Sequence, residues 1–350
     1  MQEFLIEKSS LAIAIFTLSL IVAMYSTWLE RKVAAWLQDR VGPNRAGPFG
    51  LLQPLADGGK MFFKEEFIPS ASNKFLFIAG PGIAMLTATI TGAVIPWGSD
   101  FLINGRLISL QISDINIGIL YLMGVLSIGV YGILIGGWAS NNKYSLFSAI
   151  RASSQMISYE LAMGLVVITI IMISGSMNLK EIVEKQSGAL YGISALNGLN
   201  WNIFYQPLGF VLFLTCALAE CNRAPFDLAE CETELIGGYH VEYSSMKLGF
   251  YLFAEYINMF ISSAVISTLF FGGYCFPGME HFSGISLAIL SFLTMLLKTI
   301  FFIFVFMWIR WTLPRFRYDQ LMDLGWRKMI PLALINMLIT AAVVLYFKSN

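Results

Sequence analysis

Long runs of apolar residues, each close to the length of a membrane-spanning helix, recur along the whole chain. A helix needs about 20 such residues to cross the hydrocarbon core of a bilayer. The pattern therefore predicts an all-α fold class, a polytopic membrane helix bundle of about eight transmembrane helices with long amphipathic inside loops. The predicted spans are 11–29, 75–97, 115–138, 154–174, 203–219, 248–272, 286–309 and 330–347. The fifth is the shortest and carries Gln206 and Pro207 near its start.

Lysine and arginine are distributed unevenly between the two sets of connections. Sixteen of them lie in 30–74, 139–153, 220–247 and 310–329, whereas five lie in the other connections and the termini. Positive residues are retained on the cytoplasmic side, so this imbalance predicts that the four richer loops are inside and both termini outside. Lys298 lies in the middle of the seventh span, where a charge is costly unless it is paired or hydrated.

Composition and missing motifs exclude several classes of function. Charged residues are 13% of the 350, against roughly a quarter in an average soluble domain, and 57% are hydrophobic. The formal net charge of zero gives no basic surface for nucleic acid. We find no phosphate-binding loop, dinucleotide motif, H-E-x-x-H motif or C-x-x-C pair, and therefore predict no metal site and no bound cofactor. Since no linker or inverted repeat divides the chain, we predict one integral membrane domain, 1–350.

The first inside loop, 30–74, mixes charges with apolar residues. Over 31–40 the apolar residues fall at helical spacing among charges, which suits a helix lying in the membrane interface. Gly42 and Pro43 end this piece, and a second amphipathic piece begins at Leu51. A site for an amphiphile needs an apolar slot for the tail and a few polar groups for the head. A quinone fits both demands, and a basic loop that only lies against the membrane is the alternative.

The loop after the fifth span is the most acidic stretch of the chain. Its carboxylates are Glu220, Asp227, Glu230, Glu232, Glu234 and Glu242. Pro225 is suited to opening a helical turn, which would place Glu230 and Glu234 on one face, where they repel by about 0.2–0.5 kcal/mol in water. Holding a proton is one way to relieve such repulsion, which is larger where water is scarce.

Two further carboxylates lie inside predicted spans. Glu160 and Glu255 each lie on the order of 10 Å deep by helical rise, counted from the inside, and Glu220 ends the fifth span on the same side. Chains of intramembrane acids are typical of proton relays. The alternative is that each acid forms an ion pair with a base such as Arg151 or Arg223.

Both loops resemble those of one known family. The first loop contains Glu30-Arg31-Lys32, Gln38-x-Arg40-x-Gly42-Pro43-Asn44 and Gln53-Pro54-Leu55-Ala56-Asp57 with Lys60. The acidic region contains Ala219-Glu220-x-Asn222-Arg223-x-Pro225-Phe226-Asp227-Leu228, Glu230-x-Glu232-x-Glu234-Leu235, Glu242-Tyr243 and Ala254-Glu255-Tyr256. Arg151, Tyr159-Glu160 and 314–321 extend the match. Together these motifs resemble the quinone-site membrane subunit of respiratory complex I, the NADH:quinone oxidoreductase.

The resemblance implies a subunit without a redox centre that forms much of the quinone chamber and couples quinone reduction to proton pumping. The quinone-binding candidates are Arg31, Gln38, Arg40, Asp57, Lys60, Arg310 and Arg317. The proton-coupling candidates are Glu160, Glu220, Asp227, Glu230, Glu232, Glu234, Glu242 and Glu255, with Arg151 and Arg223 as candidates for structural ion pairs.

The same resemblance implies the surroundings of the chain. Quinone is the expected substrate, FMN and iron–sulfur clusters are expected in partner subunits, and both membrane and hydrophilic subunits are expected as partners. The expected location is a bacterial inner membrane rather than a mitochondrial one. An anchor subunit of a membrane-bound hydrogenase and a stand-alone cation/proton antiporter are the alternatives. The complete first loop favours the quinone enzyme, and the missing internal repeats argue against an antiporter.

Overall fold

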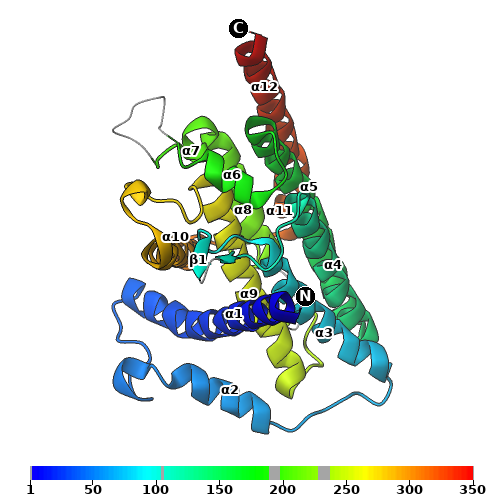
Figure 1. Cartoon of the computed structure of the whole chain (residues 1–350). Coiled ribbons are helices and arrows are strands. Elements are labelled where there is room, and N and C mark those ends of the chain that lie inside the picture. Colours follow the sequence, from blue (N-terminus) through cyan, green and yellow to red (C-terminus); the bar gives the residue numbers. More distant parts are fainter. Residues whose placement is uncertain (1, 104–105, 189–197, 228–236, 350) are drawn as a thin grey trace.

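Long helices dominate the computed structural model, which describes residues 2–103, 106–188, 198–227 and 237–349 (Figure 1). Within these ranges, seven helical segments are long and apolar enough to cross a membrane. They consist of all or most of α1 (Gln2–Leu37), α3 (Lys74–Thr91), α4 (Gly118–Ala139), α5 (Lys143–Ser174), α9 (Ser245–Phe270), α10 (Gly284–Thr312) and α12 (Ile330–Ser349), and some segments continue into neighbouring short elements. The all-α fold class is confirmed, and the chain is a multi-pass membrane protein. The side of the membrane on which the termini lie stays a prediction.

The predicted fifth span is a short helix, α8 (Pro207–Glu220), of 14 residues. That length spans about 21 Å by helical rise, less than the roughly 30 Å of a bilayer core. A separate turn, α7 (Asn202–Tyr205), precedes it, and Gln206 between them has non-helical angles of φ −133° and ψ 56°. Pro207 lacks a backbone N–H and cannot continue α7, which explains why one helix does not cover the whole apolar run.

The first helix extends further than its apolar run. Residues 31–37 continue α1 without a break, so the separate interfacial helix predicted over 31–40 is instead the end of the first membrane helix. The chain turns at Asp39, where φ is 51°. A 3-10 turn, η1 (Pro48–Gly50), leads into the helix α2 (Gln53–Phe63), which forms most of the second amphipathic piece. In Figure 1, α2 runs beside α1.

The α9 helix is the centre of the bundle and packs against α1, α2, α3, α8 and α10. Most of α9 is buried, whereas α12 is largely exposed and packs on α5 and α8. Glycines let α3 and α4 approach closely: a Cβ on Gly132 would lie 2.8 Å from the backbone nitrogen of Ala84. Such contacts between small residues are a usual way to pack helices in a membrane.

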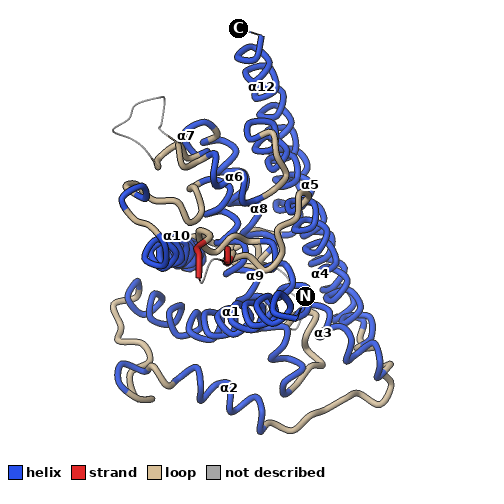
Figure 2. The backbone as a smooth tube through the Cα atoms, in the orientation of Figure 1, coloured by secondary structure: helices blue, strands red, loops and turns tan. Residues whose placement is uncertain are grey.

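The remaining elements are short and connect the long helices (Figure 2). β1 (Phe101–Ile103) and β2 (Arg106–Ile108) form an antiparallel hairpin. The short helical elements are η2 (Gly92–Val94), α6 (Leu179–Lys185), η5 (Met279–His281), α11 (Tyr318–Asp323) and the π-helical turn η6 (Leu324–Met329).

Candidate functional site

A pocket of about 250 Å³ lies among α1, α2 and α9, and we call it the first-loop pocket. Its wall is mostly apolar and combines the end of the first span, the first loop and the centre of the bundle. Arg31 and Asp57 face each other in it as an ion pair of 2.7 Å. The lining residues are Met24, Thr27, Glu30, Arg31, Pro54, Asp57, Gly58, Met61, Gly249, Leu252, Phe253 and Tyr256.

The other quinone-binding candidates lie outside the lining of this pocket. Arg40 donates a hydrogen bond of 2.8 Å to Gln38 in the exposed turn after α1. Lys60 is exposed on α2, and Arg317 forms an exposed ion pair of 2.7 Å with Asp319. The structure thus brings Arg31 and Asp57 together and leaves these four on the surface of this chain, where a further subunit would be needed to enclose them.

Glu30 is a site residue that the sequence reasoning missed. Its carboxylate is buried, and Arg310 approaches it to 2.6 Å and Arg223 to 3.3 Å. The Tyr256 hydroxyl donates to the same carboxylate at 2.9 Å, and the Arg223 guanidinium lies 4.1 Å from the centre of the Tyr256 ring. The sequence signal was an acid at the end of an apolar span, but the two bases that follow it made Glu30 look like an ordinary charge of the loop.

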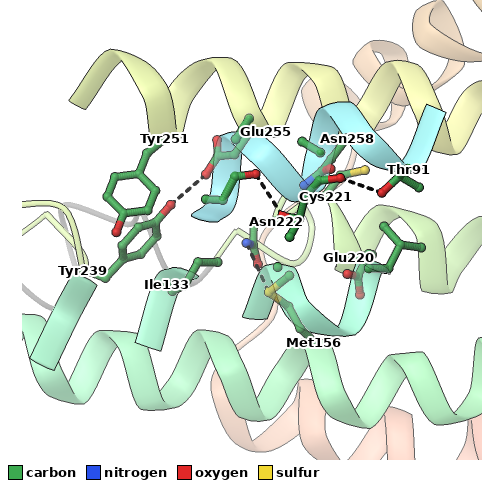
Figure 3. Close-up of a pocket in the computed structure, with 16 residues that line it drawn as sticks. Thr91, Ile133, Met156, Glu220, Cys221, Asn222, Tyr239, Tyr251, Glu255 and Asn258 are labelled. Atoms are coloured by element: carbon green, nitrogen blue, oxygen red, sulfur yellow. Dashed lines mark hydrogen bonds between the residues drawn. The ribbon is translucent and has the colours of Figure 1, made fainter. Parts of the chain in front are cut away.

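The second part of the site is a small internal cavity, the carboxylate cavity, of about 20 Å³ (Figure 3). Glu220 from α8 and Glu255 from α9 both line it. A volume of about 10–15 Å³ is enough for one water molecule, so the cavity can hold a water beside the two acids. The lining residues are Ala84, Thr87, Ala88, Thr91, Leu126, Gly129, Ile133, Met156, Glu220, Cys221, Asn222, Tyr239, Tyr251, Ala254, Glu255 and Asn258.

Hydrogen bonds connect the acids of this region to neighbouring helices. The Tyr239 hydroxyl donates to Glu255 at 3.3 Å, as Figure 3 shows. Glu160 lies one helical turn beyond Met156 on the same face of α5, and the Ser127 hydroxyl of α4 donates to it. Within the described residues, no hydrogen-bond donor reaches Glu220 Oε2. Three acids that the sequence placed at similar depth therefore gather around one region of the bundle.

At the end of the cavity away from Glu220, the lining includes Tyr239 and Tyr251, and Tyr243 packs beside Tyr251. The rings of Tyr239 and Tyr243 each pack edge-on against Tyr251, with centroids 5.1 Å apart in both pairs. The hydroxyl of Tyr251 donates to Gly132 O at 3.0 Å, and that of Tyr243 to Gly136 O at 3.3 Å. Burial raises the pKa of the Tyr243 phenol to about 12, so this hydroxyl stays protonated at neutral pH and keeps its donor role.

The remaining acidic candidates have different surroundings. Asp227 is buried and paired with Arg315 at 3.2 Å, a base that was not predicted as its partner. Glu242 accepts a hydrogen bond of 2.8 Å from Asn142. Glu230, Glu232 and Glu234 lie outside the described residues. The helical turn predicted to start at Pro225 is not found in the described part of that segment, because residues 225–227 are not helical.

The two predicted bases differ in their contacts. Arg223 pairs with Glu30 at the end of the first span. The Arg151 guanidinium lies 5.7 Å from the centre of the Tyr318 ring, which is a cation–π arrangement. Arg223 directly follows Cys221 and Asn222, which line the carboxylate cavity. Its ion pair therefore joins the region of that cavity to Glu30 in the first-loop pocket.

A family model described as NADH dehydrogenase matches residues 9–341. The chain belongs to this NADH dehydrogenase family. The match includes every described residue of the first-loop pocket and of the carboxylate cavity. The family resemblance that the motifs indicated is confirmed.

Relatives match the chain over nearly its full length. The H 1 subunit of the NADH-quinone oxidoreductase of Cytophaga hutchinsonii is 64% identical over 348 residues, which cover 99% of this chain and 98% of the relative. The H subunit of the same enzyme of Flavobacterium johnsoniae is 62% identical over 346 residues, covering 98% and 96%. NADH-quinone oxidoreductase subunit 8 of Rhodothermus marinus is 44% identical over 347 residues, covering 96% and 97%. These NADH dehydrogenase family members come from bacteria.

Proposed function

We propose that this chain is the quinone-site membrane subunit of a proton-translocating NADH:quinone oxidoreductase. The names of its relatives support a place in that enzyme complex, together with other membrane and hydrophilic subunits. In this proposal the chain takes quinone as substrate and holds no redox centre itself. FMN and iron–sulfur clusters belong to the partner subunits, and the complex lies in a bacterial inner membrane.

The observation that carries the proposal is the position of two adjacent residues on α9. Tyr256 lines the first-loop pocket and donates to Glu30, while Glu255 lines the carboxylate cavity. Successive residues of a helix point about 100° apart, so one turn of α9 lines both the first-loop pocket and the carboxylate cavity. A movement or change of charge on one side of this turn therefore acts directly on the other.

The first-loop pocket has the chemistry of a site for an amphiphile. Met24, Met61, Leu252 and Phe253 provide apolar walls for a tail. The Arg31–Asp57 pair and the Glu30 carboxylate provide charged groups beside them. A few polar groups in an otherwise apolar wall are what fix the orientation of such a ligand. In our proposal, quinone passes along this wall to the surface where a hydrophilic partner subunit reduces it.

The buried charges provide a route by which quinone chemistry influences the acids. Glu30 balances Arg310 and Arg223 in a site that excludes most water, where electrostatic interactions are strong. A charged or newly protonated quinone head group near Glu30 would change the electrostatic attraction between Glu30 and Arg223. Arg223 in turn lies next to the residues of the cavity that Glu220 and Glu255 line. These acids then take up or release protons as a coupled set. The relatives named as NADH-quinone oxidoreductase subunits favour this function over a hydrogenase anchor or an antiporter.

The proposal is tested in two steps on the assembled complex. A photoreactive short-chain quinone should label peptides of α1, α2 or α9 that line the first-loop pocket, and excess quinone should prevent the labelling. For coupling, Glu255→Gln should lower the number of protons moved per NADH in reconstituted vesicles while the reduction of a hydrophilic electron acceptor is unchanged. Labelling confined to other helices would overturn the quinone pathway, and a normal proton yield would overturn the role of Glu255.

A further inference from the structure

Lys298, in the middle of the seventh predicted span, forms hydrogen bonds to three backbone carbonyl oxygens. Lys298 lies on α10, and its ammonium donates to the carbonyl oxygens of Phe271 at 2.7 Å, Gly273 at 2.8 Å and Cys275 at 2.7 Å. A lysine ammonium has three N–H donors, so this arrangement uses all of them. The three acceptors follow directly on the end of α9.

Two more side chains bind the last turn of α9. Gln186 donates to Thr268 O at 2.9 Å, and Asn202 donates to Leu269 O at 2.7 Å. The last carbonyls of a helix have no partner within the helix, and non-helical backbone at membrane depth needs internal partners. Side chains from three other parts of the chain thus provide the hydrogen bonds that the end of α9 and the following residues lack.

Further groups around Lys298 interact favourably with an ammonium. The C-terminus of a helix carries a partial negative charge, and α9 points this end at the ammonium. The Trp201 ring centre lies 5.1 Å from the same ammonium, a cation–π distance. Among the ion pairs of the described residues, none involves Lys298, so the helix end and the carbonyls take the place of a carboxylate.

We propose that Lys298 is a positioning residue that fixes α9 along its axis and thereby sets the places of Glu255 and Tyr256. This inference rests on the proposed function, because it assigns these two residues to coupling. We call the three hydrogen bonds of Lys298 the clamp. Because α9 is continuous from Glu255 to its end, the clamp acts over about 24 Å of helix, by helical rise over the 16 residues from Glu255 to Phe271. A misplacement of about 1 Å can lower a rate on the order of a hundredfold.

The direct test of the clamp is hydrogen exchange in the assembled complex. In Lys298→Met, the amides of 267–275 should exchange faster than in the parent protein, whereas Lys298→Arg should keep part of the protection. Lys180→Met is the matched control, because Lys180 binds the Asp100 carboxylate at 2.6 Å and none of the three carbonyls. Unchanged exchange over 267–275 in Lys298→Met would overturn the clamp.

The functional test is a double-mutant cycle of Lys298→Met with Glu255→Gln. If Lys298 acts through the place of Glu255, protons moved per NADH should fall on the order of tenfold in Lys298→Met, and the double variant should be no worse than the poorer single variant. A double variant whose loss of proton yield is the product of the two single losses would overturn the positioning role. A normal proton yield in Lys298→Met, measured together with faster exchange, would also overturn it. If the Met variant fails to assemble, Lys298→Gln is measured by the same criteria.

Failure of this inference is distinguishable from failure of the proposed function. A normal proton yield in Glu255→Gln alone contradicts the proposed coupling, whatever the Lys298 variants do. A reduced yield in Glu255→Gln with no dependence on Lys298 leaves the coupling role in place and removes only the positioning residue.

Discussion

Replacing Glu30 by glutamine removes one negative charge from a buried cluster in which two arginines contact the same carboxylate. The exposed fraction of the side chain is 9% for Glu30, 4% for Arg223 and 21% for Arg310. Glutamine keeps the shape and can still accept a hydrogen bond from Tyr256, so the change mainly tests the charge. Both guanidiniums would then lack their shared carboxylate in a region with little water.

The magnitude follows from the burial of the partners. Removing one member of a buried ion pair costs about 3–5 kcal/mol, because a charge is left without compensation. Arg310 is partly exposed and glutamine keeps some hydrogen bonding, so we expect the lower end, about 3 kcal/mol. The matched control is Asp323→Asn, the same acid-to-amide change in an exposed i,i+4 pair with Arg327 at 3.0 Å. That pair is worth about 0.3–0.5 kcal/mol.

The assay is thermal inactivation of the complex in membranes, followed through both electron-transfer activities. Glu30→Gln should lower the temperature of half-inactivation of NADH:quinone reduction by several degrees and slow quinone reduction before heating. Reduction of a hydrophilic electron acceptor should survive, since the partner subunits catalyse it. Asp323→Asn should match the parent protein. A Glu30→Gln complex with parental stability and parental quinone reduction would refute the reasoning about the buried charge.

Three further predictions test other parts of the site. Asp57→Asn should raise the KM for quinone while stability changes by less than about 1 kcal/mol, because its ion pair with Arg31 is half-exposed, and steady-state kinetics with a thermal scan check this. Gly136→Ala should lower the yield of intact complex, because its Cβ would overlap a buried tyrosine hydroxyl, whereas Gly124→Ala in the same helix, with nothing within 4 Å, should be tolerated. Lys143→Cys should react with an impermeant thiol reagent only from the inside and Glu181→Cys only from the outside, and the reverse pattern would contradict the predicted orientation.

The long helices could be predicted because the bilayer imposes strict rules on the sequence. A spanning backbone must satisfy its hydrogen bonds internally and present apolar side chains, so the apolar runs mark the helices. The predicted ends of helices were less accurate where the apolar pattern and the local helix-breaking or charged residues indicated different boundaries. Gln206 and Pro207 break the fifth run into two helices, and residues 31–37 continue α1 although their charges suggested a separate piece.

The candidate site was predicted in part. Depth along each helix indicated that Glu220 and Glu255 lie at one level of the bundle, and both line the carboxylate cavity, because distance from a common membrane surface can be counted in the sequence. Depth does not specify which face of a helix meets which neighbour. The pairing of Glu30 with Arg223 joins residues 193 positions apart, and no spacing within either segment indicates it. The partner of Asp227, which is Arg315, was missed for the same reason.

The amino-acid sequence alone shows that this protein has lipid as its main solvent, that its elements are helices and that several of its acids lie at similar depth. These properties depend on local composition and on the length of each apolar run. The three-dimensional structure was needed to show that Lys298 binds the end of α9, that Glu30 contacts two arginines, and that adjacent residues of α9 line two different parts of the site. These contacts depend on how helices distant in sequence are rotated and placed against each other, and close packing in three dimensions fixes that arrangement.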